Sequence, residues 1–329
     1  MKTPKRMIDQ QFHVTEGDVQ REVRKMPPNA YDGVFCDPPY GLGFMGKDWD
    51  KNVPGVAVWQ EMLRVCKPGA YLMAFGSPKT FHRLMCQIED AGWEIKDTIC
   101  WLYGEGFPKS NDFSKSVRRY HGHRKTERRV QGRGTSLKPA WEPIVLAMKP
   151  VHGSYAKNTV VYGCGGLNIN ECRVQGKNGR WPANLLLDEE AAALLDKQSG
   201  WSRSTKNRRR IARSLPGNGR TMGYFRLRLD GEGGYDDEGG ASRFFYVAKA
   251  KGKERDGNEH PAVKPVELCE YLARLILPPK RDTPRCLFVP FSGSGSEMMG
   301  AVNAGWDHVR GIEKSKEFAK LSRERLRQQ

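Results

Sequence analysis

The chain has 329 residues, which is enough for one large α/β domain with an inserted or appended module. Its formal net charge of +17 at pH 7 indicates a polyanionic partner. It has no apolar run of transmembrane length, which favours nucleic acid over lipid and predicts no membrane partner. The eight cysteines form no C-x-x-C pair, so we expect no metal site and reduced thiols in a cytosol. The polar start of the sequence resembles no targeting segment.

Strands and helices alternate through the first hundred residues, a pattern typical of a doubly wound sheet. The stretch Ala70–Phe75 is apolar without a break, as expected for a strand buried on both faces of a parallel sheet. Residues 41–50 predict a glycine-rich loop with aromatic side chains, among them Phe44 and Trp49. The other elements expected here are strands at 12–14, 31–36 and 93–103, and helices at 19–25, 56–65 and 79–91.

The composition changes at Gly104, and residues 104–139 are polar and strongly basic. We predict a long loop without a core of its own, which is usually functional or mobile. Residues 151–243 form a second unusual region, with a basic run at 203–213. The remaining expected elements are strands at 141–147, 159–162, 172–174 and 244–247, a helix at 189–196, and an amphipathic helix within 260–277.

A carboxylate and an aromatic ring follow directly on the apolar residues 34–36, in the sequence Asp37-Pro38-Pro39-Tyr40. Proline fixes φ and has no N–H, so the backbone of this turn can only accept hydrogen bonds there. An exocyclic amine on a flat base fits such a site, because it offers two hydrogens to acceptors and a plane to a ring. A chance turn is the alternative, and a second motif far along the chain argues against it.

That second motif is a glycine-rich turn after the apolar run 286–289, with the sequence Phe291-Ser292-Gly293-Ser294-Gly295. A helical pattern begins at Glu297, and a short strand over 308–312 is followed by Glu313. A strand, a glycine turn and a helix N-terminus allow backbone N–H groups to approach the negative end of a cofactor. A carboxylate after the next strand typically accepts hydrogen bonds from ribose hydroxyls, so we predict a nucleotide-type cofactor here.

The first motif resembles motif IV of the DNA amino-methyltransferases, which methylate adenine N6 or cytosine N4, and the second resembles their F-x-G-x-G cofactor motif. Residues 260–265 are similar to the H-P-x-x-K-P element of that family, and residues 141–143 to the strand before its variable segment. The order of these motifs resembles the beta class, a circular reordering of the class I methyltransferase chain. The resemblance covers residues 12–149 and 242–327.

This resemblance implies the α/β fold of the class I S-adenosylmethionine-dependent methyltransferases, a Rossmann-like doubly wound sheet with an inserted target-recognition region. It implies a catalytic half at 1–150, a target-recognition region at 151–243 and a cofactor-binding half at 244–329, with S-adenosylmethionine as the cofactor. The cofactor-binding residues that it implies are Asp18 beside the adenine, Phe291, Ser292, Gly293, Ser294 and Gly295 in the turn, Glu313 at the ribose, and Lys264 at the methionine carboxylate. An ordinary surface lysine is the alternative for Lys264.

The predicted reaction is site-specific DNA methylation at the exocyclic amine of a flipped base. Asp37 and the carbonyl of Pro38 are expected to accept the amine hydrogens, which frees the nitrogen lone pair, and Tyr40 to stack on the base. Phe44 and Trp49 are candidates for a second wall against the base. The alternative is that their side chains anchor the loop. Asp at the first motif position favours adenine N6 over cytosine N4, which stays an alternative. No Pro-Cys dipeptide is present, which excludes cytosine C5 methylation.

Two further alternatives stay open. One is methylation of RNA or of a protein amide. The other is a catalytically inactive DNA-binding relic, because family members usually carry Asp where this chain has Val289.

Double-stranded DNA is the expected partner, in the cytoplasm of a prokaryote or as a phage-encoded protein. The sequence leaves open whether the chain forms a homodimer, whether it serves restriction-modification, and which DNA word it recognises. The basic residues that we expect to contact phosphates or a groove are Arg118, Arg119, Arg124, Arg128, Arg203, Lys206, Arg208, Arg209 and Arg210.

Overall fold

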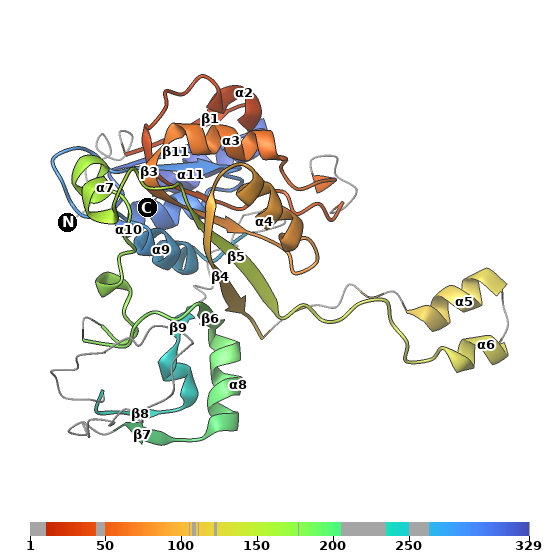
Figure 1. The fold of residues 1–329 in the computed structure, drawn as a ribbon. Coiled ribbons are helices and arrows are strands. Elements are labelled where there is room, and N and C mark those ends of the chain that lie inside the picture. Colours follow the sequence, from red (N-terminus) through yellow and green to blue (C-terminus); the bar gives the residue numbers. More distant parts are fainter. Residues whose placement is uncertain are drawn as a thin grey trace, which may run out of the picture.

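A nine-stranded sheet forms the centre of the molecule (Figure 1), as seen in a computed structural model. The model describes residues 11–43, 50–104, 106, 110, 112–121, 124–176, 178–204, 235–249 and 263–328. The strands, in their order across the sheet, are β1 (Phe12–Glu16), β11 (His308–Glu313), β10 (Cys286–Pro290), β2 (Tyr31–Cys36), β3 (Cys66–Phe75), β5 (Trp141–Met148), β4 (Glu94–Leu102), β6 (Leu185–Asp188) and β9 (Tyr246–Ala248). All neighbours pair in parallel except β5, which is antiparallel to both β3 and β4. The doubly wound sheet predicted from the sequence is confirmed.

Helices cover both faces of this sheet. One face carries α2 (Val19–Val23), α3 (Val56–Val65) and α4 (Phe81–Asp90), and the other carries α9 (Val266–Leu275), α10 (Ser296–Ala304) and α11 (Lys316–Gln328). Strand β3 shows why its sequence is apolar throughout. Leu72 and Ala74 belong to the cluster under α3 and α4, whereas Met73 and Phe75 belong to the cluster under α9 and α10. Successive side chains alternate between two buried faces, so both sets must be apolar.

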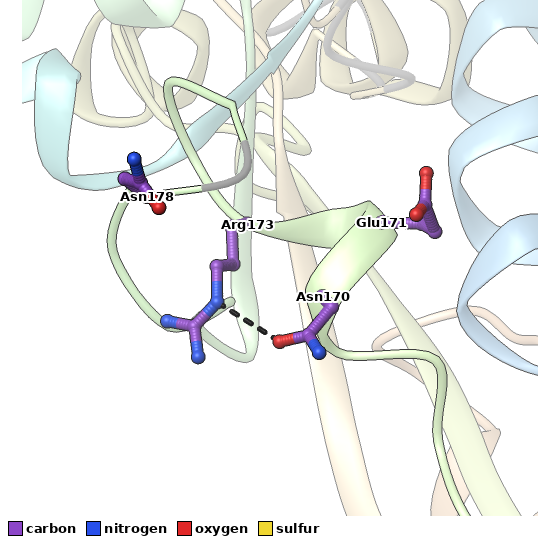
Figure 2. Close-up of a pocket in the computed structure, with 4 residues that line it drawn as sticks. All are labelled: Asn170, Glu171, Arg173 and Asn178. Carbon is purple, nitrogen blue, oxygen red and sulfur yellow. Dashed lines mark hydrogen bonds between the residues drawn. The ribbon is translucent and has the colours of Figure 1, made fainter.

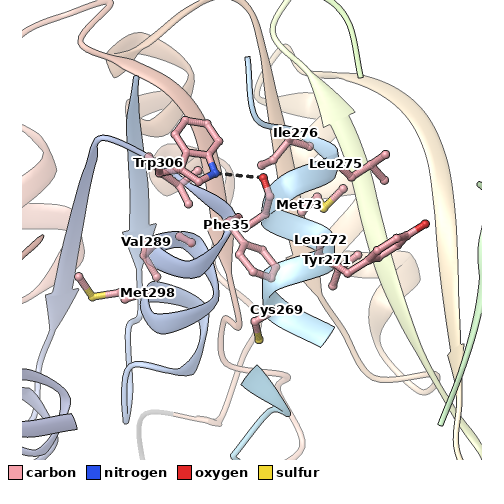
Figure 3. Packing of buried hydrophobic residues seen from close by; sticks show 14 of the residues in the cluster. Phe35, Met73, Cys269, Tyr271, Leu272, Leu275, Ile276, Val289, Met298 and Trp306 are labelled. Carbon is pink, nitrogen blue, oxygen red and sulfur yellow. Dashed lines mark hydrogen bonds between the residues drawn. The ribbon is translucent and has the colours of Figure 1, made fainter. Parts of the chain in front are cut away.

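The core under α9 brings residues from four distant segments together (Figure 3). Trp306 is fully buried, and its indole Nε1 donates to the carbonyl of Ala273 on α9, 3.0 Å away. A Cβ on Gly33 of β2 would lie 3.2 Å from the Trp306 ring, so glycine at that position lets the indole pack against the strand. Val289 and Met298 complete this apolar cluster on the side of β10 and α10. Full burial of a side chain of this size contributes roughly 1.5–3 kcal/mol.

An arm projects from the ends of β4 and β5 (Figure 1) and contains α5 (Phe113–His121) and α6 (Arg124–Arg129). The prediction of a loop over residues 104–139 is therefore wrong for these two segments. Asp112 accepts from the backbone N–H of Ser114 at 2.9 Å, as an N-terminal helix cap does, and Phe113 and Val117 are spaced one turn apart. The surrounding basic residues obscure this weak helix signal in the sequence.

A second protrusion lies below the sheet in Figure 1 and contains α8 (Glu189–Ser199), β7 (Ser202–Ser204) and β8 (Asp237–Gly239). Two predictions for residues 151–243 are wrong. Residues 159–162 lie in a helix, α7 (Tyr155–Tyr162), because Ser154 caps its N-terminus and Gly163, at φ +74°, ends it. Residues 172–174 are not a strand either: a 3-10 helix spans Asn170–Cys172, and Val174 forms an isolated bridge with Arg180. In contrast, β6 and β9 extend the main sheet.

Candidate active site

The two sequence motifs leave neighbouring strands at the same edge of the sheet. Strands β2 and β10 pair in parallel, with Leu287 opposite Gly33 and Phe288 opposite Val34. Asp37 follows the end of β2 and Phe291 the end of β10, so both turns lie at the carboxyl edge. From β10 the chain continues to β11 on one side, and from β2 it continues to β3 on the other. Such a reversal of strand order is where open α/β sheets bind ligands.

A buried lysine connects the D-P-P-Y turn to the segment before α9. Lys264 is 5% exposed, and its Nζ lies 3.0 Å from Asp37 Oδ2 and 3.2 Å from Glu142 Oε2. The same ammonium donates to the hydroxyl of Tyr40 at 2.9 Å, and that hydroxyl donates to Asp37 Oδ1 at 2.6 Å. Lys264 also lies over the ring of Phe75, 4.8 Å from its centroid. The alternative of an ordinary surface lysine is therefore wrong.

Burial and the charges of this cluster shift the pKa values of Lys264, Glu142 and Tyr40. Burial lowers the pKa of Lys264, but the carboxylates of Asp37 and Glu142 outweigh this effect and raise it well above its ordinary value. Burial raises the pKa of Glu142, and the ammonium of Lys264 partly opposes that rise. Burial, together with the charge of Asp37, also raises the pKa of Tyr40 well above its ordinary value. Lys264 is therefore a fixed cation at neutral pH, and Tyr40 keeps its proton.

Two residues outside the motif hold the backbone of the turn. Asp50 is 2% exposed, and its Oδ1 accepts from the N–H groups of Tyr40 and Gly41 at 2.7 and 3.0 Å. Thr80, which precedes α4, donates from its hydroxyl to the carbonyl of Tyr40 at 2.6 Å. Neither residue is part of a recognisable motif, although an aspartate after a glycine-rich loop is a typical partner for turn N–H groups.

The glycine turn has the backbone conformation that its sequence predicts. Gly293 and Gly295 have φ of +49° and +89°, and Phe291 shares the left-handed region at +61°. Glu313, at the end of β11, accepts from the N–H of Gly293 at 2.8 Å with one oxygen and from that of Ser315 at 2.8 Å with the other. Glu313 thus fixes the turn as well as being a candidate for the ribose.

The other predicted cofactor residues lie around this turn. Asp18 caps α2 by accepting from the N–H of Gln20 at 3.0 Å, and it is partly exposed. Ser294 is held by Arg325, whose Nη1 donates to its carbonyl at 2.7 Å. Ser292 is fully buried, and its hydroxyl has no hydrogen-bond partner among the described residues.

A further carboxylate follows the glycine turn and feels the charge of Asp37. Glu297 is in the first turn of α10 and is only 4% exposed. Burial raises its pKa to about 8, and the charge of Asp37 adds to the rise. Its position two residues after the glycine turn is the signal that would have identified it.

The predicted DNA contacts divide into two groups. Four exposed arginines lie on the arm and one on β7: Arg118, Arg119, Arg124, Arg128 and Arg203. Lys206, Arg208, Arg209 and Arg210 lie outside the described residues, as do Phe44 and Trp49. The arm begins after β4, which runs parallel to β6 and, through two antiparallel pairings with β5, parallel to β3 and β2. It therefore leaves the same edge of the sheet as Asp37.

Two surface hollows lie away from these motifs. One, of about 530 Å³, is lined by Asn170, Glu171, Arg173 and Asn178 (Figure 2). In it, Arg173 Nε donates to Asn170 Oδ1 at 3.2 Å. The second, of about 420 Å³, shares Glu171 and Arg173 with the first. Neither is lined by Asp37 or the glycine turn, so the chemistry of the two motifs does not depend on them.

A family model described as DNA methylase, for N6 and N4 enzymes, matches residues 31–324, most of the chain. The chain belongs to the N6/N4 DNA methylase family. Its family model spans both motifs and the whole region between them. Among the described residues, no helix combines the length and the apolar character that a membrane span requires.

Individual relatives are distant. The type II methyltransferase M.HindIII of Haemophilus influenzae is 23% identical, over 45% of this chain and 62% of the relative, so the chain spans less than two thirds of that protein. The cytosine-N4-specific PvuII DNA methyltransferase has a similar structure, with a TM-score of 0.51 at 14% identity over 96% of this chain and 86% of the other. TTHA0409 of Thermus thermophilus, solved with S-adenosyl-L-methionine, has a TM-score of 0.48 at 14% identity, over 96% and 93% of the two chains. The predicted fold of the class I S-adenosylmethionine-dependent methyltransferases is confirmed.

Proposed function

We propose that this chain is a beta-class DNA methyltransferase that transfers a methyl group from S-adenosylmethionine to the exocyclic amine of a flipped base, with adenine N6 favoured. The observation that carries this proposal is that the D-P-P-Y turn and the glycine turn leave adjacent strands at one edge of the sheet. Methyl transfer needs the nitrogen and the methyl carbon within about 3–3.5 Å of each other. Turns on neighbouring strands, about 4.8 Å apart, are close enough for the groups that they bind to be in contact.

The residues around the glycine turn fit the proposed cofactor. S-adenosylmethionine supplies an electrophilic methyl group on a sulfonium sulfur. Phe291, Gly293 and Gly295 would hold its methionine and ribose portions, with Ser292 and Ser294 completing the turn, and Glu313 would accept from the ribose hydroxyls. Asp18, at the end of the adjacent strand β1, would lie near the adenine. The 3.0 Å distance from Lys264 to Asp37 favours a role in positioning Asp37 over the expected contact with the methionine carboxylate.

Asp37 and Pro38 carry the proposed chemistry on the acceptor side. Each oxygen of Asp37 accepts one bond, from Tyr40 or Lys264, and keeps lone-pair capacity for the amine. Accepting the amine hydrogens at Asp37 and at the carbonyl of Pro38 localises the lone pair on nitrogen, which makes it a better nucleophile. The ammonium of Lys264, 3.0 Å from Asp37 Oδ2, would hold the Asp37 side chain in place for this role.

The location of the basic segments supports a DNA substrate. The arm and the α8 protrusion both follow strands, β4 and β6, whose carboxyl ends lie at the edge that holds Asp37. Basic side chains of these two segments would neutralise phosphates and position a duplex, with residues 151–243 as the proposed target-recognition region. We propose that the protein acts in the cytoplasm, and a partner nuclease is not required by this geometry.

Cytosine N4 is the second candidate acceptor, because it offers the same pair of hydrogens to Asp37 and Pro38. The cytosine-N4-specific PvuII enzyme has a similar fold, at 14% identity, so this fold is compatible with cytosine N4 as the acceptor. The two acceptors differ in ring size, so the walls of the base pocket decide between them.

Expression in a host that lacks DNA methylation, followed by sequencing of its genome for modified bases, tests the proposal. We expect N6-methyladenine within one recurring DNA word, its loss in Asp37→Ala, and its persistence in the exposed control Asp282→Ala. N4-methylcytosine would support the second candidate. Unmodified DNA from the wild-type strain would refute methyltransferase activity, and methylation that persists in Asp37→Ala would refute the role of Asp37.

A further inference from the structure

Glu297 is a buried carboxylate without a counterion of its own. It is 4% exposed, and it forms no ion pair with any described lysine, arginine or histidine. It is also the only acidic side chain between Cys286 and Ala304, the whole of β10, the glycine turn and α10. Val289, at the end of β10, packs in the apolar cluster of Figure 3 and offers no charge to the turn.

The charges around Glu297 do not balance. Cys36 and Asp37 face it from the end of β2, Lys264 from the segment before α9, and Arg325 from α11. The single ammonium of Lys264 is already shared between Asp37 and Glu142. Arg325 makes the weakest contribution, and its guanidinium donates to Ser294. The backbone N–H of Glu297 itself lowers the pKa of this carboxyl, but burial and the charge of Asp37 raise it by more. A buried carboxylate in this position therefore binds either a proton or a cation from outside.

The geometry identifies which part of a ligand this carboxylate faces. Under the proposed function, on which this inference rests, Asp37 holds the acceptor amine. The sulfonium must lie next to that amine, because its methyl group is in contact with the nitrogen. Glu297 lies in the first turn of α10, directly after β10, and β10 pairs with β2, the strand that precedes Asp37. The proposed ribose and adenine contacts, Glu313 and Asp18, lie toward β11 and β1 instead.

We propose that Glu297 is the counterion of the cofactor sulfonium, and that it releases a proton when the positively charged cofactor binds. The ligand that Glu297 selects is therefore an adenosyl sulfonium in preference to the neutral thioether left after methyl transfer. The raised pKa of Glu297, about 8, means that the free protein carries this proton at neutral pH. The side chain thus acts as a positioning and selectivity residue.

Isothermal titration calorimetry in buffers of different ionisation enthalpy measures this proton. S-adenosylmethionine and S-adenosylhomocysteine share the same amino acid and nucleoside, so the difference between them isolates the sulfonium. At pH 7 we expect close to one extra proton to be released with the sulfonium ligand, and its affinity to rise by up to tenfold per pH unit below pH 8. In Glu297→Gln we expect the extra proton to disappear and the sulfonium ligand to bind at least tenfold more weakly at pH 8, with less than a threefold change for the thioether.

The exposed glutamate Glu317 provides a matched control, and Glu317→Gln should behave like the wild type. At neutral pH the wild type must take up a proton at Glu297 when it folds, which costs stability. Glu297→Gln avoids this cost, so it should stay folded with a higher melting temperature than the wild type in the absence of ligand, which circular dichroism checks. Equal proton release in wild type and Glu297→Gln, or equal weakening of both ligands, would overturn this inference alone. If the wild-type protein bound neither ligand, the proposed function itself would fail.

Discussion

Lys264→Met removes the cation from the centre of the candidate active site and keeps a side chain of similar length. Lys264 is 5% exposed and pairs with Asp37 and Glu142, so the variant leaves two carboxylates without their partner. Breaking a buried ion pair from one side costs about 3–5 kcal/mol. With an unfolding entropy of about 2.1 cal/mol/K per residue, 329 residues give roughly 0.7 kcal/mol/K, so the melting temperature should fall by roughly 4–7 °C.

The decrease in the free energy of unfolding caused by Lys264→Met should depend on pH. In the wild type the pKa of Lys264 is raised, so its stabilising contribution is present at all pH values below its ordinary pKa of 10.5. In Lys264→Met the pKa of Glu142 should rise further, because the ammonium that opposes the effect of burial is gone, and protonation of Glu142 relieves the unpaired charge at low pH. The deficit in the free energy of unfolding should therefore be small at pH 5 and reach its full size by pH 8.

Thermal and urea unfolding at pH 5, 7 and 8 measures this deficit. Lys316→Met, on the exposed start of α11, controls for loss of a lysine, and it should change the free energy of unfolding by less than about 0.5 kcal/mol. The double variant Lys264→Met/Glu142→Gln should recover part of the deficit at pH 8, because one unpaired carboxylate becomes neutral. A deficit below about 1 kcal/mol, or one that does not change between pH 5 and pH 8, would refute the ion-pair account.

Four other variants probe separate parts of the molecule. Asp32→Asn should cost about 3–5 kcal/mol in urea unfolding, because this buried carboxylate accepts from two cationic side chains, yet cofactor affinity should stay within threefold of wild type. Asp50→Ala should abolish methylation in the host genome while the protein still binds cofactor, since it releases only the turn after Tyr40. Gly295→Ala should weaken cofactor binding more than tenfold and lower the melting temperature, because its φ is +89° and a Cβ would lie 2.4 Å from a serine hydroxyl. Replacing Arg118 and Arg128 by Ala should reduce the slope of log affinity for duplex DNA against log salt by about 2, and an unchanged slope would exclude the arm from DNA contact.

Local sequence predicted the strands that carry the two motifs and their neighbours β1, β3, β4, β5 and β11, because each has its own apolar signal, whereas it missed β6. The unbroken apolar run of β3 and the apolar residues before Asp37 follow directly from burial on two faces. The arm was harder to predict, because the only signals for α5 are one cap at Asp112 and an apolar pair, which the basic residues outnumber. Residues 159–162 include β-branched side chains, which is why a strand was predicted there. The caps at Ser154 and Gly163 stabilise a helix instead.

The two motifs of the site could be predicted from the sequence, whereas the contacts of their side chains with distant residues could not. The D-P-P-Y turn and the glycine turn are visible because a few residue types at fixed spacing determine their backbone. Lys264 was assigned to the cofactor carboxylate, and its contact with Tyr40, 224 residues away along the chain, depends on the order of strands in the sheet. The roles of Glu142 and Glu297 were not predicted for the same reason. They depend on a charge that is near in space and not on the neighbouring residues in the sequence.

Strand order also explains why the arrangement of the motifs along the chain does not alter the site. The proposed site requires only that β10 lies beside β2, with both running in the same direction. The two turns lie at the same edge whether β10 precedes or follows β2 along the chain. Lys264 lies in the segment that leads into α9. The beginning of the described chain, β1, pairs with β11 near its end, and Arg323 of α11 donates to the carbonyl of Val14 at 2.9 Å. The two ends are therefore neighbours in space, so a reordered chain can close around the same sheet without moving Asp37 away from Gly293.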